Sequence, residues 1–98
     1  MAVRQVVFRP QAADDASEVK AWYESRRAGL GYEFGLAIEA LLARILNNPM
    51  MFLRVHGETR RAVLSRFPYA LYFRAVSDQI VVLAIHGRQR PGRWRARS

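Results

Sequence analysis

Beyond residue 9, the spacing of hydrophobic residues changes once, at residues 47–49, which read Asn-Asn-Pro. Before this point, apolar side chains recur every three or four residues, the spacing that puts them on one face of a helix. After it, they alternate with polar residues or run together in short stretches, as they do in strands. Because the residue before a proline is disfavoured in the helical region, the helix must end there. The chain is therefore restricted to a helical part followed by a β part.

Two helices are expected in the helical part. Pro10 suits the first turn of the first helix, where its missing N–H costs nothing. Asp14 and Asp15 are expected in that same turn, near the positive end of the helix dipole, and Arg26 and Arg27 close the helix. Its buried stripe, with Trp22 beside it, is formed by Ala12, Ala16, Val19 and Tyr23.

Residues 29–31, Gly-Leu-Gly, form a tight turn into the second helix. So short a link predicts an antiparallel helical hairpin. The spacing of Gly29, Gly31 and Gly35 fits neither phosphate-binding motif, which makes them turn and helix-packing glycines. The apolar face of the second helix is formed by Leu30, Phe34, Ile38, Leu41, Leu42 and Ile45.

Strands are expected at residues 3–8, 60–66, 70–75 and 79–86. The last of these is apolar on both faces, which indicates a central position in a sheet. The predicted order is strand, helix, helix and three strands (β-α-α-β-β-β). This is an α+β fold in which an antiparallel helical hairpin packs on one face of a small, mostly antiparallel sheet.

Composition limits the class of protein. The 98 residues, 51% of them hydrophobic, suit one domain over residues 1–98, with a basic C-terminal tail at 87–98. The absence of cysteine excludes disulfides, thiolate nucleophiles and cysteine metal ligands. No targeting segment is visible, and the longest aliphatic run, at 80–85, is far shorter than the roughly 20 residues of a membrane helix. We therefore expect a cytoplasmic protein with no membrane association.

The net charge of +8 is divided unevenly along the chain. Residues 1–39 hold five basic and six acidic residues, a net of −1, and residues 40–98 hold eleven basic and two acidic, a net of +9. Fifteen of the sixteen basic residues are arginine, whose planar guanidinium binds phosphate or carboxylate through paired donors and stacks on bases. A genome rich in G and C raises the arginine content but does not segregate it. We expect the second half to contact a polyanion or an acidic protein surface.

Basic side chains of the second half are the candidate target-binding residues. In the tail, Trp94 lies among the arginines and adds a stacking surface, a composition typical of single-stranded RNA sites and of protein hot spots. The alternative is an ordinary solvated tail. The candidates are Arg60, Arg61, Arg66, Arg74, Arg88, Arg90, Arg93 and Trp94.

Two histidines, His56 and His86, complete the candidates for chemistry. No third nitrogen or sulfur ligand lies at metal spacing, so neither a metal nor a cofactor is expected. His86 ends the last expected strand, directly before the arginine tail, where it could act as a general acid or base. The alternative is a hydrogen bond at a strand end.

Two segments of the chain read RRAVLSRFPYALYFR and IVVLAIHGRQRPGRW. Together they contain a strand with arginines, a Phe-Pro-Tyr connection, an aliphatic strand ending in histidine and an Arg-Pro-Trp tail. In this order they resemble the ParE/RelE superfamily of toxins from type II toxin–antitoxin systems. The helical hairpin upstream fits as well, so the resemblance covers essentially the whole chain. It implies a RelE-like fold and a cognate antitoxin that wraps an extended or helical segment over the hairpin and the sheet.

The resemblance implies one of two targets. ParE-like members inhibit DNA gyrase, whereas RelE-like members cleave messenger RNA in the ribosomal A site without a metal. In the ribonuclease branch, an arginine follows the tyrosine of the connection, a basic residue lies two positions after Arg61, and a tail tyrosine often serves as a base. The corresponding residues here are Ala70, Val63 and Trp94.

In the ribonuclease alternative, the chain would be a ribosome-dependent endoribonuclease in which Arg61, Arg88 and Arg90 bind phosphate and His86 is the acid or base. Each missing charged group would cost such a site about 10²-fold or more in rate. We therefore favour the gyrase inhibitor, which is not an enzyme. A third alternative, from charge alone, is a nucleic-acid-binding domain without toxicity.

Both toxin interpretations predict exposed apolar surface that the antitoxin buries. The candidates do not all fit the inward-facing stripe. The alternative is that residues 50–53 cover the edge of the sheet. The candidates are Leu36, Leu46, Met50, Met51 and Phe52.

Overall fold

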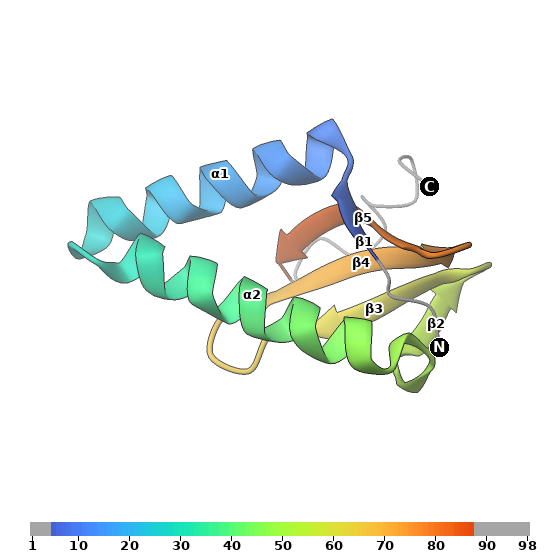
Figure 1. Ribbon diagram of the computed structural model, residues 1–98. Coiled ribbons are helices and arrows are strands. Elements are labelled where there is room, and N and C mark those ends of the chain that lie inside the picture. Colours follow the sequence, from blue (N-terminus) through green and yellow to red (C-terminus); the bar gives the residue numbers. More distant parts are fainter. Residues whose placement is uncertain (1–4, 88–98) are drawn as a thin grey trace.

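The computed structural model describes residues 5–87. A first strand leads into two helices, and four further strands follow (Figure 1). The elements are β1 (Gln5–Phe8), α1 (Pro10–Arg26), α2 (Leu30–Asn47), the 3-10 turn η1 (Pro49–Met51), β2 (Leu53–His56), β3 (Thr59–Val63), β4 (Tyr69–Val76) and β5 (Gln79–Gly87). The predicted α+β class and helical hairpin are confirmed, and the change of structure falls at the predicted position.

The strands form one sheet in the order β1-β5-β4-β3-β2. β1 pairs with β5 in parallel, and the other three pairs are antiparallel. β5 therefore lies between two strands, as its apolar faces predict. β1 pairs only with Gln79–Val82, and the edge of β5 beyond it is open to contacts from α1.

The main core lies between the helical hairpin and one face of the sheet (Figure 1). Phe34 of α2 is fully buried and meets Phe67 edge to face, with ring centroids 5.2 Å apart. Tyr23 of α1 contacts both rings, at 5.5 Å and 4.9 Å. Phe67 is the first residue of the Phe-Pro-Tyr connection, so this motif anchors the β3–β4 loop under the hairpin.

The hairpin is held together by Glu24, near the end of α1. Its carboxylate accepts the backbone N–H of Gly29 at 2.9 Å and that of Gly31 at 3.0 Å, so it satisfies two donors at the start of α2. Gly29 has a φ of 90°, a conformation that glycine adopts without strain. At Gly31 the helices approach so closely that a Cβ would lie 2.6 Å from the carbonyl oxygen of Lys20. The interpretation of these glycines as turn and packing residues is confirmed.

A fourth C-terminal strand, β2, is missing from the sequence-based prediction, which has three. β2 pairs with β3 through a short turn in which Gly57 has a φ of 55°. Its four residues, Leu-Arg-Val-His, alternate between apolar and polar, and this pattern before Gly57 is the signal that indicates a hairpin. The alternative in which residues 50–53 cover the edge of the sheet holds only in part, because only Leu53 among them belongs to the edge strand β2.

Three details of the helices differ from the prediction. Asp14 and Asp15 lie beyond the first turn of α1, which contains no acidic residue, because the helix begins at Pro10. Trp22, which is expected beside the buried stripe, is 49% exposed. Among the predicted exposed apolar residues, Leu46 and Phe52 instead pack against the core.

No helix within residues 5–87 is long and apolar enough to cross a membrane.

Candidate functional site

The sheet face opposite the helices, called the open face below, is the first candidate surface. Ala70, Tyr72 and Ala84 form a small cluster there with Val55, separate from the main core. Residues that lie opposite each other on paired strands share a face, so Arg61, paired with Tyr72, belongs to it as well. None of the helices within residues 5–87 covers this face (Figure 1).

The predicted target-binding arginines divide between the two sides of the sheet. Arg61 is exposed on the open face, and the half-buried Arg74 lies on the same face, two residues after Tyr72 along β4. Diagonal neighbours of this kind are within reach of each other's long side chains. Arg61 and Arg74 therefore form a cationic surface beside Tyr72, whose side chain is buried.

Arg60 and Arg66 each bind partners within the chain. Arg60 donates to the carbonyl oxygens of Phe52 at 2.7 Å and Met50 at 3.4 Å, and so ties η1 to β3. Arg66 donates to the carboxylate of Glu33 on α2 at 2.8 Å. The structure thus does not bring these two arginines together with Arg61 and Arg74. The remaining predictions, Arg88, Arg90, Arg93 and Trp94, lie outside the described residues.

His86, the predicted acid or base, is only 5% exposed and lies where α1 meets β5. Its Nε2 is 3.6 Å from Oδ2 of Asp15, and the same oxygen accepts the backbone N–H of Ile85 at 3.0 Å. Asp15 thus occupies the edge of β5 that β1 leaves free. The imidazole of His86 is thus a buried group beside the Asp15 carboxylate, at the end of β5.

Val63 and Ala70, the positions that are basic in the ribonuclease branch, are cross-strand partners in the β3–β4 pair. Ala70 is buried, and His86 is its partner on the other side, in β5. Val63, Ala70 and His86 thus follow one another across three neighbouring strands on the open face.

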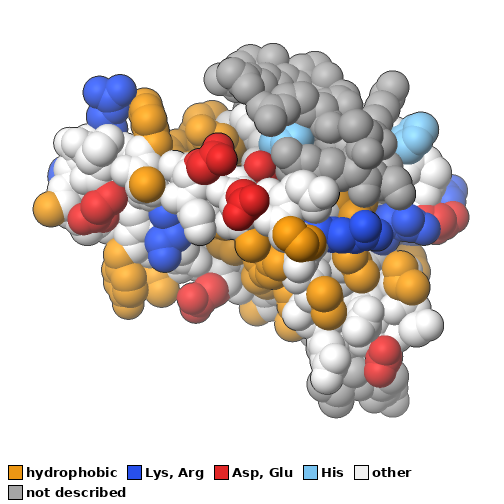
Figure 2. Space-filling model, turned by 90° about the horizontal axis from the view of Figure 1, so that it is seen from above, with side chains coloured by type: hydrophobic (Ala, Val, Ile, Leu, Met, Phe, Trp, Pro, Cys, Tyr) orange, Lys and Arg blue, Asp and Glu red, His pale blue; other side chains and the backbone are white. Residues whose placement is uncertain are grey.

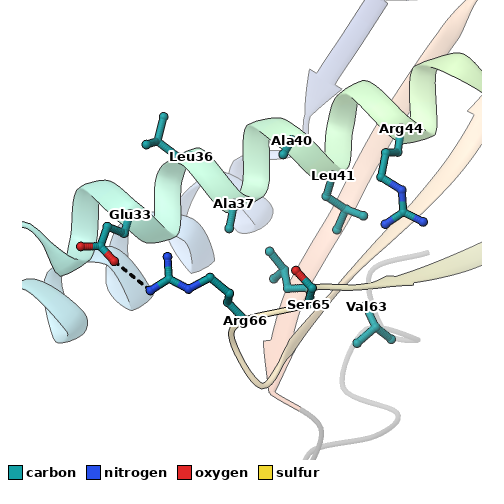
Figure 3. Close-up of a pocket in the computed structure, with 10 residues that line it drawn as sticks. Glu33, Leu36, Ala37, Ala40, Leu41, Arg44, Val63, Ser65 and Arg66 are labelled. Atoms are coloured by element: carbon teal, nitrogen blue, oxygen red, sulfur yellow. Dashed lines mark hydrogen bonds and ion pairs between the residues drawn. The ribbon is translucent and has the colours of Figure 1, made fainter.

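A groove between α2 and the end of β3 is the second candidate surface, and the sequence analysis missed it (Figure 3). Its volume is about 330 Å³. The signal for it was the pair of small residues on α2, Ala37 and Ala40, opposite a strand that ends in a loop. The groove is lined by Glu33, Leu36, Ala37, Ala40, Leu41, Arg44, Val63, Leu64, Ser65 and Arg66.

Charged residues stand at both ends of the groove along α2. At one end, Glu33 binds Arg66 and lies 3.6 Å from Arg27. The hydrogen bond from Arg66 lowers the pKa of the Glu33 carboxyl; loss of surrounding water raises this pKa by less, and the charge of Arg27 lowers it further. At the other end, the guanidinium of Arg44 lies over the ring of Phe52 at 5.5 Å. Within residues 5–87, no carboxylate forms an ion pair with Arg44.

Exposed hydrophobic side chains are spread over the surface in the view of Figure 2, at the helical end as well as the sheet end. Leu36, Met50 and Met51, three of the predicted antitoxin contacts, are 45–59% exposed. Leu53, at 66%, was not predicted. In the described part of the chain, no three histidine, aspartate or glutamate side chains are grouped as metal ligands would be.

Comparison with solved structures finds ten chains that match this one. A chain of the chromosomal ParDE TA (toxin–antitoxin) system from P. aeruginosa aligns with a TM-score of 0.75 and 16% sequence identity, over 87% of this chain and 96% of that one. No protein-family model matches the chain, and no curated protein matches it significantly. The chain therefore shares its fold with a component of a ParDE toxin–antitoxin system.

Proposed function

We propose that this protein is the toxin of a type II toxin–antitoxin pair, neutralised by a cognate antitoxin, and that it inhibits DNA gyrase. The likeness to a ParDE component over almost the whole of both chains carries the proposal. It agrees with the segments around the Phe-Pro-Tyr connection and with the net charge of +9 in residues 40–98. The proposed site is a binding surface and not an active site.

Gyrase is favoured over the ribosome by the chemistry of the open face. A ribonuclease of this kind needs several charged groups around the scissile phosphate, because removing one such group costs about 10²–10³-fold. Val63 and Ala70 form an uncharged pair at that place, and the imidazole of His86 is buried beside Asp15. An imidazole that solvent hardly reaches is poorly placed to take a proton from an RNA hydroxyl.

In the proposed mode, Arg61 and Arg74 dock on the target together with the predicted tail residues Arg88, Arg90 and Trp94. Arginine and aromatic side chains are the residues that most often dominate the energy of protein interfaces. Arg60 and Arg66 would contribute less, since their donors already have partners within the chain.

A gyrase supercoiling assay with purified protein tests the proposal. We expect inhibition by the wild type and strong loss of inhibition when Arg61 and Arg74 are both replaced by glutamate. Arg54→Glu is the matched control, because Arg54 is exposed and pairs only with the exposed Glu58 among the described residues. Unchanged supercoiling at micromolar wild-type protein would contradict gyrase as the target.

Replacing Arg88, Arg90 and Trp94 together tests the tail in the same assay. We expect inhibition to be lost while the circular dichroism spectrum is retained. Primer extension on induced cells covers the alternative target: cuts in phase with codons of translated messages would identify a ribosome-dependent endoribonuclease. Harmless overexpression would favour a nucleic-acid-binding domain without toxicity.

A further inference from the structure

The outer corner of the sheet, where the edge strand β2 pairs with β3, exposes apolar side chains on the open face (Figure 1). Leu53 pairs with Arg61 and therefore shares its face. Leu53 is 66% exposed, more than any other large hydrophobic side chain of the described strands. Val63, 38% exposed, follows Arg61 by two residues on the same face, and its side chain points away from α2 (Figure 3). Leu53, Arg61 and Val63 are called the corner below.

The three residues of the corner are close neighbours. Leu53 and Arg61 lie directly opposite each other, so their Cβ atoms are about 4.5–5.5 Å apart. Leu53 and Val63 are diagonal neighbours, with Cα atoms about 7–8 Å apart. Two exposed apolar side chains thus flank one exposed guanidinium. Apolar side chains that gather in this way on a surface indicate a contact with another molecule, whereas single scattered ones do not.

The arginines at and beside the corner have donors to offer. Within residues 5–87, no carboxylate forms an ion pair with Arg61 or with its diagonal neighbour Arg74. The Nε–H of Arg74 is buried, and no hydrogen-bond acceptor for it lies in this part of the chain. A buried donor without an acceptor costs free energy, so an acceptor from another molecule would stabilise this arrangement.

Together these features fit an acidic protein surface that carries an exposed apolar side chain. Carboxylates supply acceptors to the arginines, and an apolar side chain removes Leu53 and Val63 from water. Nucleic acid fits less well, because an aliphatic side chain neither binds phosphate nor offers a ring on which a base stacks. A second copy of the chain also fits poorly, since each copy has a net charge of +8 and a two-fold contact would bring both Arg61 side chains into one interface.

We propose that the corner determines the specificity of the target contact for a protein. Leu53 and Val63 form the apolar centre of that contact, and Arg61 and Arg74 bind carboxylates around it. The identity of the partner as gyrase rests on the proposed function, whereas the chemistry of the corner does not. The arginines speed association with an acidic surface, and the apolar centre slows dissociation.

Surface plasmon resonance on immobilised gyrase tests the corner with a matched pair of variants. Leu53→Gln makes the corner polar at nearly constant length, and Tyr32→Gln replaces a similarly exposed side chain, at 68%, on α2. We expect Leu53→Gln to dissociate at least about tenfold faster, with an unchanged association rate and salt dependence. Tyr32→Gln should bind like the wild type, and Leu53→Met, which keeps the apolar contact, should restore slow dissociation.

Two results of this experiment would overturn the proposal. One is a Leu53→Gln variant that leaves gyrase at the wild-type rate. The other is slower association with a smaller salt dependence, the behaviour expected of Arg61→Glu, because it would mean that the substitution disturbs the charges instead of an apolar contact. Because Leu53 is mostly exposed, we expect thermal unfolding of the variant to match that of the wild type.

A synthetic peptide tests the corner without gyrase. The probe is a fluorescent, alanine-based helical peptide with two leucines on one face and glutamates around them, and its control has serines in place of the leucines. We expect the wild type to bind the leucine peptide at least about tenfold more tightly than the serine peptide. In Leu53→Gln this preference should fall below about threefold, as measured by fluorescence anisotropy.

Other occupants give different results with the same variants. A leucine preference that Leu36→Gln removes and Leu53→Gln keeps would place the peptide in the groove along α2 and refute the corner. A single-stranded RNA oligonucleotide should lose affinity in Arg61→Glu and keep it in Leu53→Gln; equal losses in both would argue against a protein partner. Light scattering that finds a dimer of the wild type and a monomer of Leu53→Gln would assign the corner to a second copy instead.

The gyrase and peptide assays separate the corner from the proposed function. A wild type that does not bind gyrase but prefers the leucine peptide would contradict gyrase as the target and support the corner. A wild type that inhibits gyrase, yet binds the leucine and serine peptides equally, would contradict the corner alone.

Discussion

Glu33 shows how one side chain links distant parts of the chain. It lies in the first turn of α2, where a negative charge is favourable, and binds Arg66 from the β3–β4 loop as well as Arg27 from the end of α1. Arg66 in turn lies over the ring of Phe67, at 5.2 Å. Because all these groups are partly exposed, each pair contributes little to stability. Their shared carboxylate nevertheless fixes the loop that carries the aromatic anchor of the core.

The pH dependence of stability follows from the pKa of Glu33. This pKa is lowered from 4.5 in the folded protein, above all by the hydrogen bond from Arg66. The resulting stabilisation is therefore complete above about pH 5 and is lost as the pH falls through the folded pKa. We expect Glu33→Gln to lower the free energy of unfolding at neutral pH and to lose this effect in acid, as measured by urea denaturation between pH 7 and about pH 3. Glu39→Gln, at an exposed position of α2, is the control; a deficit of Glu33→Gln that persists in acid would contradict the assignment.

The helical hairpin and strand β5 are the elements that determine the shape of the molecule. The hairpin depends on the close approach of α1 and α2 at Gly31 and on the carboxylate of Glu24 at the start of α2. Strand β5 lies between β1 and β4 and meets α1 through Asp15, beyond the point where β1 ends. Each element thus relies on a polar or close contact that helical periodicity does not reveal.

Two glycines of α2 provide a matched test of the hairpin. A Cβ at Gly31 would lie 2.6 Å from the backbone oxygen of Lys20, whereas at Gly35 the nearest atom is the flexible end of the Lys20 side chain, at 3.6 Å. We expect Gly31→Ala to destabilise the protein by about 1–3 kcal/mol, because the helices must move apart. Gly35→Ala should stabilise it by about 0.5–1 kcal/mol, the ordinary gain from alanine in a helix. Thermal and urea unfolding measure both, and equal effects of the two substitutions would contradict the close packing.

The junction between α1 and β5 predicts a difference between adjacent aspartates. Asp15 accepts the N–H of Ile85 in a partly buried position, and Asp14 is exposed. We expect Asp15→Ala to lower the free energy of unfolding by about 1–3 kcal/mol, because a β5 donor loses its acceptor. Asp14→Ala should change it by less than about 0.5 kcal/mol. Amide hydrogen exchange checks the mechanism: faster exchange at Ile85 is expected in the Asp15 variant, and unchanged exchange there would argue against it.

At the scale of the whole molecule, charge differs between the two halves of the sequence and between the two faces of the sheet. The first half has a net charge of −1 and the second of +9. In the fold, Arg60 and Arg66 bind partners within the chain, whereas Arg61 and Arg74 lie on the open face. A net charge of +8 also speeds the approach of any acidic partner, because oppositely charged surfaces attract over a Debye length of about 10 Å at 0.1 M salt.

This charge predicts how target binding responds to salt. If the protein binds gyrase through its basic surface, raising the salt from about 50 to about 200 mM should weaken binding mainly by slowing association. The Arg61→Glu and Arg74→Glu double variant should show a smaller salt dependence, and Arg54→Glu a nearly normal one. Surface plasmon resonance measures both rates. A salt-independent association rate of the wild type would show that the charge does not steer binding.

The sequence by itself determined the order and type of the long elements, because a helix or a strand imposes its spacing on adjacent residues. That is why the hairpin, the change at 47–49 and the central position of β5 could be predicted. The sequence did not determine which arginines share a surface, since this depends on strand register and on partners far along the chain, such as Glu33 for Arg66. The short strand β2, the burial of His86 beside Asp15 and the groove along α2 likewise arise only when separate elements pack together. Local periodicity is encoded within a few residues, whereas a binding surface is assembled from residues that only the tertiary structure brings side by side.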